Sequence, residues 1–481
     1  MTASGRFADA NAAPYRSLPM RLFNLAGRVP PLAFSLDPER LVAKALQASG
    51  RRDLGSLDAF LREGLARLVT SLETEARLDN VGRAIAQENI VDALATRLKL
   101  EAYWGQHPDV AERPTVAPLF IVGLPRTGTT FLYQLLDQDE ALRAPRTWEL
   151  SCPPALGRRS TDAQIARTQR WIDRFYAMSP GLQALHNSSA TTPEEDFSIF
   201  RLELRSTYFS VFFHIPAYLE WVLDGMEASS FALHRRYLQT LAVPGDGRRW
   251  LLKSPEHLFR LRALLETYPD AKIVHCHRDP LAVCASEASL ITRLHGIGSA
   301  AADISVMAGE LPAIFARMLD SVWRFRAASA SAGAFHDLHF DHLEADPMAA
   351  LAGVYRHLGV EMSDVALSRL EKFVAENPRH RHGSHRYPAV SRASLAPEVE
   401  SAFRAYTDTF GIRTGACPRA CRSSAASCSV LPQPSCWAWP RAGARCGGTS
   451  CTMPRAGAWP ATSGPRRHTR WSALHWLPRT R

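Results

Sequence analysis

The chain has 481 residues, of which 46% are hydrophobic and 22% are charged, and these ordinary values exclude a disordered or collagen-like protein. This length suits one large domain with a smaller one, or roughly two to three domains. The formal net charge of +10 would suit nucleic acid as a partner, but residues 415–481 hold ten Arg and no Lys, Asp or Glu, so the preceding residues are electrically balanced and no nucleic-acid partner is expected.

The amino-terminal quarter predicts an arm followed by helices. Residues 1–35 are rich in Pro, Ala and Arg and show no clear periodicity, which is typical of an extended arm. Apolar residues then recur at three- and four-residue steps in 57–72 and in 90–98, a pattern that predicts amphipathic helices. We therefore expect residues 36–114 to form a helical amino-terminal layer.

Two features of the sequence bear on its compartment. No apolar run reaches the roughly 18 residues that a membrane-spanning helix needs, and the first residues lack the charged start and apolar block of a secretory signal. Before residue 415 the only cysteines are Cys152, Cys276 and Cys284, which suits a reducing compartment. We expect a cytoplasmic protein without stable membrane insertion, whereas the sequence predicts no particular oligomeric state.

Strand patterns alternate with helical patterns from residue 115 onward. Short apolar runs at 118–123, 249–252, 271–275 and 335–340 predict β-strands, and helical stretches follow them. This alternation predicts an α/β domain over residues 115–414, with a parallel sheet flanked by helices and ligands beyond the carboxyl ends of the strands.

Residues 164–241 read mainly as helical and carry several aromatic side chains, among them Phe197, Tyr208, Phe212 and Trp221. Side chains of this kind serve either a core or a substrate pocket. Their spacing does not distinguish the two roles, so both stay open from the sequence.

The first strand leads into a glycine loop with the sequence VGLPRTGTTF (122–131). Gly123 and Gly128 have the GxxxxG spacing of a phosphate loop, in which backbone N–H groups and the start of the next helix converge on an oxyanion. A nucleoside-triphosphate loop has Lys after the second glycine, but this chain has Thr129, and Arg126 lies inside the loop instead. The pattern predicts an anion site without ATPase activity, and its alternative is a plain strand-to-helix turn.

A second anion site is predicted after the strand at 271–275. In HRDPLAVCAS (277–286), Arg278 ends the strand and Ser286 follows eight residues later on the next helix, so a guanidinium and a hydroxyl could converge on one phosphate. The alternative for Arg278 is a surface ion pair with Asp279.

Two further segments carry basic side chains. LLKSPEHL (251–258) places Lys253 and His257 at another strand end, and RHRHGSHRYP (379–388) places His385 and Arg386 in a loop that could cover a bound polyanion or could be a solvated turn. With two phosphate-type sites and no evident metal-ligand set, the sequence predicts a nucleotide with phosphates at two positions and no metal.

Taken together, these motifs resemble the sulfotransferases that use 3′-phosphoadenosine 5′-phosphosulfate (PAPS), in particular the bacterial branch whose loop reads PRxGTT. The resemblance covers residues 115–412 and rests on the order of PRTGTT, PEED (193–196), LKSPEHL, HRDP with Ser eight residues beyond Arg, HRY and a closing helix that ends in FGI (410–412). It implies a P-loop-like α/β fold.

The resemblance also implies the roles of the site residues. Arg278 and Ser286 would bind the 3′-phosphate. The 5′-phosphosulfate would be bound by Pro125, Arg126, Thr127, Gly128, Thr129 and Thr130. Animal cytosolic members have Lys where Arg126 stands, so the role of Arg126 as a catalytic charge stabiliser is inferred from its position alone.

Sulfuryl transfer also needs a group that removes the proton of the acceptor hydroxyl. The candidates are His257, which follows the Lys-containing strand end, and Glu149, which follows the first helix of the domain; His257 is favoured. The PEED segment could order the acceptor pocket, or it could be an acidic helix start. The acceptor would be a small molecule, a lipid or a sugar with a hydroxyl group.

Two other functional classes remain as alternatives. A degenerate nucleotide kinase lacks support because the loop has no Lys after Gly128. A basic binding module for nucleic acid or membrane lacks support because the excess charge lies in residues 415–481.

Residues 415–481 differ in composition from the rest of the chain. They hold six Cys and five Trp but no Ile, Phe, Tyr or Asn, a mixture that a GC-rich coding region gives when it is read in the wrong frame. We therefore expect a disordered, out-of-frame basic tail. The alternatives are a genuine disordered basic tail and a Cys-rich metal module, although no CxxC pair repeats there.

Overall fold

The computed structural model describes residues 16–26, 34–157, 160–226, 231–243, 245–328, 331–377 and 394–414. All of them belong to one compact unit, residues 1–416. The predicted basic tail and the loop with His385 and Arg386 lie outside the described residues.

Five parallel strands form the central sheet, in the order β2-β3-β1-β4-β5. The strands are β1 (Leu119–Gly123), β2 (Leu142–Arg143), β3 (Arg249–Lys253), β4 (Lys272–His277) and β5 (Phe335–His339). The predicted α/β fold with a parallel sheet is therefore confirmed. The sequence missed β2 because a strand of two residues is too short to show any periodicity.

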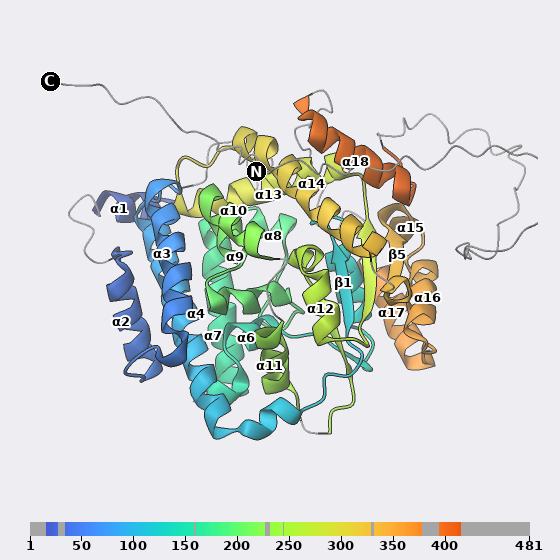
Figure 1. Cartoon of the computed structure of the whole chain (residues 1–481), viewed down its shortest axis with the longest axis horizontal. Helices are drawn as coiled ribbons and strands as arrows, with labels where there is room; N and C mark the ends of the chain where they lie inside the picture. Colours follow the sequence, from blue (N-terminus) through green and yellow to red (C-terminus); the bar gives the residue numbers. More distant parts are fainter. Residues whose placement is uncertain are drawn as a thin grey trace, which may run out of the picture. The chain divides into compact units, whose positions relative to one another are not determined.

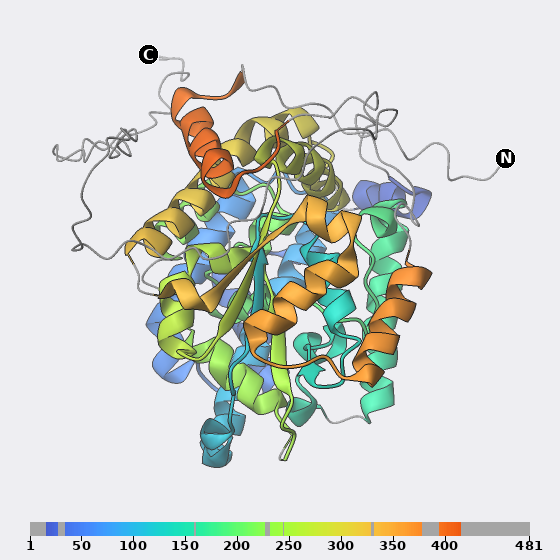
Figure 2. The same cartoon turned by 90° about the vertical axis from the view of Figure 1, so that its right-hand side faces the viewer.

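The sheet is buried on both faces, as a parallel sheet requires. Leu119 and Ile121 of β1 point to one face, where they join a core with α5 (Thr129–Leu136), α16 (Pro347–Leu358) and α17 (Asp364–Glu376). Figure 2 shows α16 and α17 in orange in front of the strands. Phe120 and Val122 point to the other face and join the larger core.

Helices from the middle of the chain build much of that larger core. They are α6 (Thr147–Ser151), α7 (Thr161–Met178), α8 (Leu182–Leu185), α9 (Tyr208–Phe212), α10 (Pro216–Gly225), α11 (Ala232–Leu241), α12 (Leu261–Thr267), α13 (Pro280–Gly298) and α14 (Ile304–Ala328). A 3₁₀ segment, Asp196–Glu203, runs among them. The later helix α18 (Pro397–Phe410) joins the same core, whereas α15 (Phe340–Ala345) contributes Leu343 to the core on the opposite face. Within the described part of the chain, no helix has both the length and the apolar character to span a membrane.

The amino-terminal layer contains α1 (Leu18–Ala26), α2 (Pro38–Ser49), α3 (Asp58–Thr74) and α4 (Asn80–Gln106). Figure 1 shows it in blue, with the green middle helices between it and the strands. Helix α1 lies where the sequence predicted an arm. Its nine residues are too few to show a periodic pattern, and it is held by tertiary contacts: the side chain of Asn24 accepts from the backbone N–H of Val81 at 3.1 Å and donates to Asp79 at 3.0 Å.

A chain that ends at Thr414 is expected to keep the melting temperature and the nucleotide affinity of the full chain. Helix α18 ends at Gly411, whose φ of +60° is left-handed, and the N–H of Ile412 closes the helix on the Thr407 carbonyl at 2.8 Å. Thermal melting and nucleotide titration of both chains test this. A melting temperature several degrees lower in the shorter chain would show that residues 415–481 contribute to the folded structure.

Candidate functional site

The loop between β1 and α5 is shaped by its two glycines. Gly128 has a φ of +85°, and a Cβ there would come within 3.0 Å of the Phe340 ring. A Cβ on Gly123 would come within 2.7 Å of the Cys276 carbonyl oxygen on the neighbouring strand. Thr127 is fully buried and its hydroxyl donates to the Leu124 carbonyl at 2.7 Å, so its side chain closes the loop. The loop therefore has the tight, glycine-dependent turn into a helix start that phosphate loops use to bind an oxyanion.

Arg126 lies in the same loop with a φ of +62°, a left-handed conformation that is costly for a residue with a Cβ. Its Nε donates to the Ser286 hydroxyl at 3.0 Å, and its Nη1 donates to the Leu185 carbonyl at 2.9 Å. Strain of this kind is concentrated at functional sites, where the surrounding structure holds it in place.

Arg278 follows β4 and contacts the loop directly. Its Nη1 donates to the Arg126 carbonyl at 2.7 Å, and its guanidinium lies 3.9 Å from the centre of the Phe340 ring. Because β1 and β4 pair in register, with Gly123 opposite Cys276, their carboxyl ends meet at one edge of the sheet. The structure thus joins the two predicted anion sites into one cluster of Arg126, Arg278 and Ser286.

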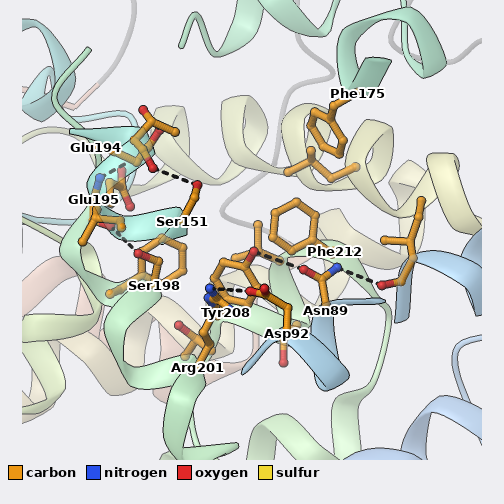
Figure 3. A pocket seen from close by; sticks show the side chains of 18 of the residues that line it. Asn89, Asp92, Ser151, Phe175, Glu194, Glu195, Ser198, Arg201, Tyr208 and Phe212 are labelled. Carbon is orange, nitrogen blue, oxygen red and sulfur yellow. Dashed lines mark hydrogen bonds and ion pairs between the residues drawn. The ribbon is translucent and has the colours of Figure 1, made fainter. Parts of the chain in front are cut away.

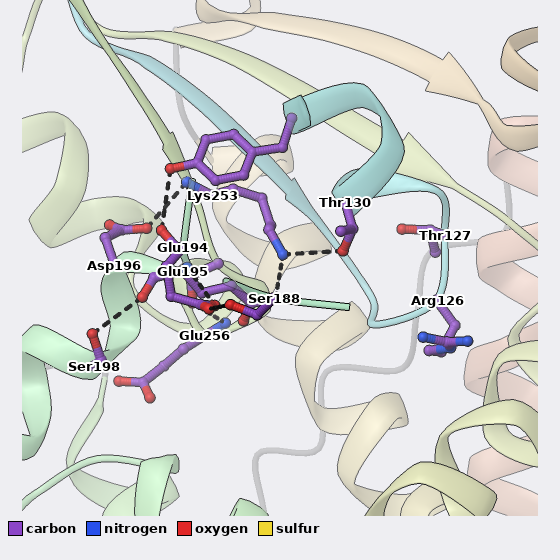
Figure 4. Close-up of polar contacts among 12 residues, drawn as sticks. Arg126, Thr127, Thr130, Ser188, Glu194, Glu195, Asp196, Ser198, Lys253 and Glu256 are labelled. Carbon is purple, nitrogen blue, oxygen red and sulfur yellow. Dashed lines mark hydrogen bonds and ion pairs between the residues drawn. The ribbon is translucent and has the colours of Figure 1, made fainter. Parts of the chain in front are cut away.

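Lys253 adds a third cation from the end of β3. Its Nζ donates to the Thr130 hydroxyl at 3.2 Å and forms an ion pair with Glu195, and only 2% of the residue is exposed. Figure 4 shows Lys253 reaching Thr130 at the start of α5, while the Arg126 side chain extends away from this contact. The sequence placed Lys253 at a strand end but did not assign it a role, because its partner Glu195 is 58 residues away in the chain.

Asp196, the last residue of PEED, fixes the position of Lys253. Its Oδ1 accepts from the Lys253 backbone N–H at 3.1 Å, and its Oδ2 accepts from the Nε2 atoms of His257 and His234 at 2.9 and 2.7 Å. Burial alone would raise the pKa of Asp196, but the His257 and His234 imidazoles outweigh it and hold this pKa well below its usual range. Asp196 is therefore a buried carboxylate that ties the PEED segment to the end of β3.

His257 does not have the surroundings expected of a base that meets an acceptor. It is fully buried, its Nε2 is bonded to Asp196, and its ring packs on Phe120 and Phe231 at centroid distances of 5.2 and 5.5 Å. The reason is local: residues 255–259 form a 3₁₀ turn that directs His257 into the core behind the strand.

Glu149 is also committed to a structural role. Its Oε1 accepts from Arg143 and its Oε2 accepts from the backbone N–H of Arg146, both at 2.8 Å, so it caps α6. Only 6% of the residue is exposed. Neither His257 nor Glu149 is among the described residues that line the cavity beside the loop.

A cavity of about 1770 Å³ opens beside the loop and extends to the amino-terminal helices. The described loop residues Pro125, Arg126, Gly128, Thr129 and Thr130 line it at one end, together with Arg278, Glu194 and Glu195. Phe23 of α1 and the end of α2 line it elsewhere. One continuous space therefore connects the cation cluster with the helical layer.

Aromatic side chains form a chain of ring contacts along this cavity. Centroid distances are 5.3 Å from Trp171 to Phe175, 6.0 Å from Phe175 to Phe212, 5.1 Å from Phe212 to Tyr208 and 5.6 Å from Tyr208 to Phe197. Figure 3 shows Phe175, Phe212 and Tyr208 on the cavity wall, with Glu194 and Glu195 at its other side. Phe197, Tyr208 and Phe212, whose role the sequence left open, are thus lining residues.

The wall also carries one strong polar pair. Arg201 is 5% exposed and its Nη2 lies 2.9 Å from Oδ2 of Asp92, whose side chain is about half exposed. Both line the cavity near Tyr208 (Figure 3). Trp221, in contrast, is not among the described lining residues; it stacks under Arg205 at 4.2 Å.

Comparison with known proteins finds a protein family that matches this chain. The model of the sulfotransferase family matches residues 118–364. The chain is 27% identical over 288 residues to the omega-hydroxy-beta-dihydromenaquinone-9 sulfotransferase Stf3 of Mycobacterium bovis, a match that covers 57% of this chain and 71% of the relative.

Two solved structures are also similar. The sulfotransferase STF1 of Mycobacterium tuberculosis H37Rv has a TM-score of 0.63 at 29% identity, with 76% of this chain and 98% of that chain covered. The sulfotransferase STF9 of Mycobacterium avium has a TM-score of 0.66 at 26% identity, with 78% and 97% covered.

Proposed function

The chain belongs to the sulfotransferase family and is a transferase that moves a sulfuryl group to a hydroxyl acceptor, and we propose that its donor is PAPS and its acceptor a long-chain lipid. The observation that carries this proposal is the joint placement of the cation cluster and the apolar cavity. Arg126 and Arg278 line one end of a space that is otherwise lined largely by aromatic and aliphatic side chains, and Lys253 donates to Thr130 at the same end.

The donor is inferred from the two kinds of anion-binding group. The loop and the start of α5 suit a phosphate with its sulfuryl group, and Arg278 with Ser286 suits a second phosphate at another position of the same nucleotide. The loop has room for the phosphosulfate because residue 128 is a glycine: a Cβ there would fill the space beside Phe340. With Thr129 where a triphosphate loop has Lys, the ammonium group comes instead from Lys253 on β3.

The chemistry assigned to these residues is electrostatic. During in-line transfer the bond between sulfur and the bridging oxygen breaks, and negative charge grows on the phosphate that leaves. Lys253 and the N–H groups of the loop are placed to stabilise that charge. Three cationic side chains at one site supply the charge that a divalent metal would otherwise bring, so we propose that binding needs no metal.

The acceptor is inferred from the size and lining of the cavity. Pockets for small ligands usually measure about 300 to 1,000 Å³, whereas this cavity measures about 1770 Å³. It runs from Thr130 to Phe23, so a lipid could present its hydroxyl at the loop and rest its chain against the helices. The lipid named as substrate of the mycobacterial Stf3 agrees with this assignment. Because Cys152, Cys276 and Cys284 are free thiols, we place the reaction in the cytoplasm.

An acceptor panel with ³⁵S-labelled PAPS tests the proposal. We expect label in long-chain lipid alcohols, including a polyisoprenoid quinone with a terminal hydroxyl, and little label in soluble sugars or simple phenols. Faster transfer to a sugar or a simple phenol than to any lipid would overturn the lipid assignment while leaving the donor assignment intact.

A further inference from the structure

Most acidic side chains of the cavity wall are already engaged. Glu195 is paired with Lys253, Glu194 accepts from the Ser188 hydroxyl at 2.9 Å, and Glu256 accepts from the Thr207 hydroxyl at 2.6 Å. Farther along the wall, Asp92 pairs with Arg201 and Glu310 with His214, and Glu88 is exposed. Apart from Glu88, which faces solvent, these carboxylates are held by cations or hydroxyls.

Glu287 is different. It lies on α13 directly after Ser286, lines the cavity, and is 7% exposed. Its Oε2 is buried and has no hydrogen-bond partner among the described residues. Leaving a buried carboxylate unpartnered is costly, and a native protein keeps such a group mainly where it has a function.

The charges around Glu287 belong to the site itself. Burial raises its pKa to about 7; Arg126 and Lys253 act to lower this pKa, and Glu195 acts to raise it. Glu287 is therefore close to the loop arginine and to the Lys253–Glu195 pair, and it changes protonation state near neutral pH. A proton acceptor works best with a pKa near the working pH.

We propose that Glu287 is the base that takes the proton of the acceptor hydroxyl. This inference rests on the proposed function. As the acceptor O–H bond breaks, the proton passes to a carboxylate oxygen of Glu287 and the acceptor oxygen forms a bond to sulfur. The bond between sulfur and the bridging oxygen breaks, and its electron pair stays on the phosphate beside Lys253. Glu287 then returns its proton to water.

Glu195 is the competing carboxylate. Glu195 lines the same cavity, but it is paired with Lys253. Protonation of Glu195 would break that ion pair and leave Lys253 without its partner. His257 and Glu149, the bases that the sequence suggested, do not reach the cavity. Glu287 meets the acceptor space without giving up a partner, which favours it.

The substitution Glu287→Gln tests the role, because it keeps the size and removes the proton acceptor. We expect kcat for sulfuryl transfer to fall about a hundredfold, with unchanged affinity for 3′-phosphoadenosine 5′-phosphate (PAP). The wild-type kcat should rise with pH through about 7 as the carboxylate loses its proton and then level off. In E287Q this rise should be absent, and E287D should restore it in part. Glu266, an exposed residue on α12, gives a matched control: the variant E266Q should behave as wild type.

The outcomes distinguish a failure of the Glu287 assignment from a failure of the proposed function. If E287Q keeps both its turnover and the pH rise, Glu287 is not the base, and loss of that rise in E195Q would assign the role to Glu195. If E287Q fails to fold, the pH profile of E287D decides, since a profile identical to wild type would overturn the inference. If the wild-type chain transfers no label from PAPS to any hydroxyl, the proposed function fails instead.

Discussion

Lys253→Met is expected to lower kcat by about a hundredfold to a thousandfold, while the affinity for PAP changes only a few-fold. Lys253 is buried at the end of β3 with its Nζ at the Thr130 hydroxyl, so its charge acts where the leaving phosphate gains negative charge. Removing one such preorganised group typically costs this much in kcat. Single-turnover transfer from PAPS and titration with PAP measure the two quantities separately.

Two controls are needed, because this substitution leaves the partly buried carboxylate of Glu195 without its cation. The double variant K253M/E195Q removes that carboxylate, and we expect it to recover thermal stability but not turnover. Lys272→Met, at the amino end of strand β4, should leave turnover unchanged. An unchanged kcat in K253M with a large loss of affinity would reassign Lys253 to ground-state binding.

Arg278→Ala is expected to weaken PAP binding by about 1.5 to 3 kcal/mol, or roughly 10- to 150-fold, the range of a charge-assisted hydrogen bond. The guanidinium is held over Phe340 and against the Arg126 carbonyl, so it is preorganised at the cavity edge. Isothermal titration with PAP and with adenosine 5′-monophosphate, which lacks the 3′-phosphate, measures the effect.

If Arg278 binds the 3′-phosphate, the variant should lose most of the preference for PAP over adenosine 5′-monophosphate. The exposed Arg262 on α12 offers a matched control, since R262A should keep the preference. A variant R278A that still discriminates strongly between the two nucleotides would show that another group binds the 3′-phosphate.

The sequence predicted that Arg126, Arg278 and Ser286 belong to anion sites, and the structure places these three residues together; that they bind an anion stays a prediction. A short buried strand, a glycine loop and an Arg after a later strand are local patterns, and the parallel pairing of β1 with β4 brings them together at one edge. The fold class was confirmed for the same reason. Helix α1 and strand β2 were missed because they are short and depend on tertiary contacts.

The proton-handling part of the site could not be predicted in this way. His257 has a suitable position in the sequence, yet a 3₁₀ turn directs it toward Asp196 in the core. Glu149 is used by Arg143 and the α6 cap. Glu287 has no motif of its own, since its character comes from burial and from the charges of Arg126, Lys253 and Glu195, which only the packed structure reveals.

Titration of the full chain with PAP in excess chelator tests the central claim most directly. We predict that one PAP binds per chain and that the chelator leaves the affinity unchanged. Adenosine 5′-monophosphate should bind at least about tenfold more weakly, because it lacks the 3′-phosphate that Arg278 and Ser286 would hold. Equal affinity for the two nucleotides, or tighter binding of ATP that requires magnesium, would contradict the assignment of this site to a 3′-phosphorylated sulfuryl donor.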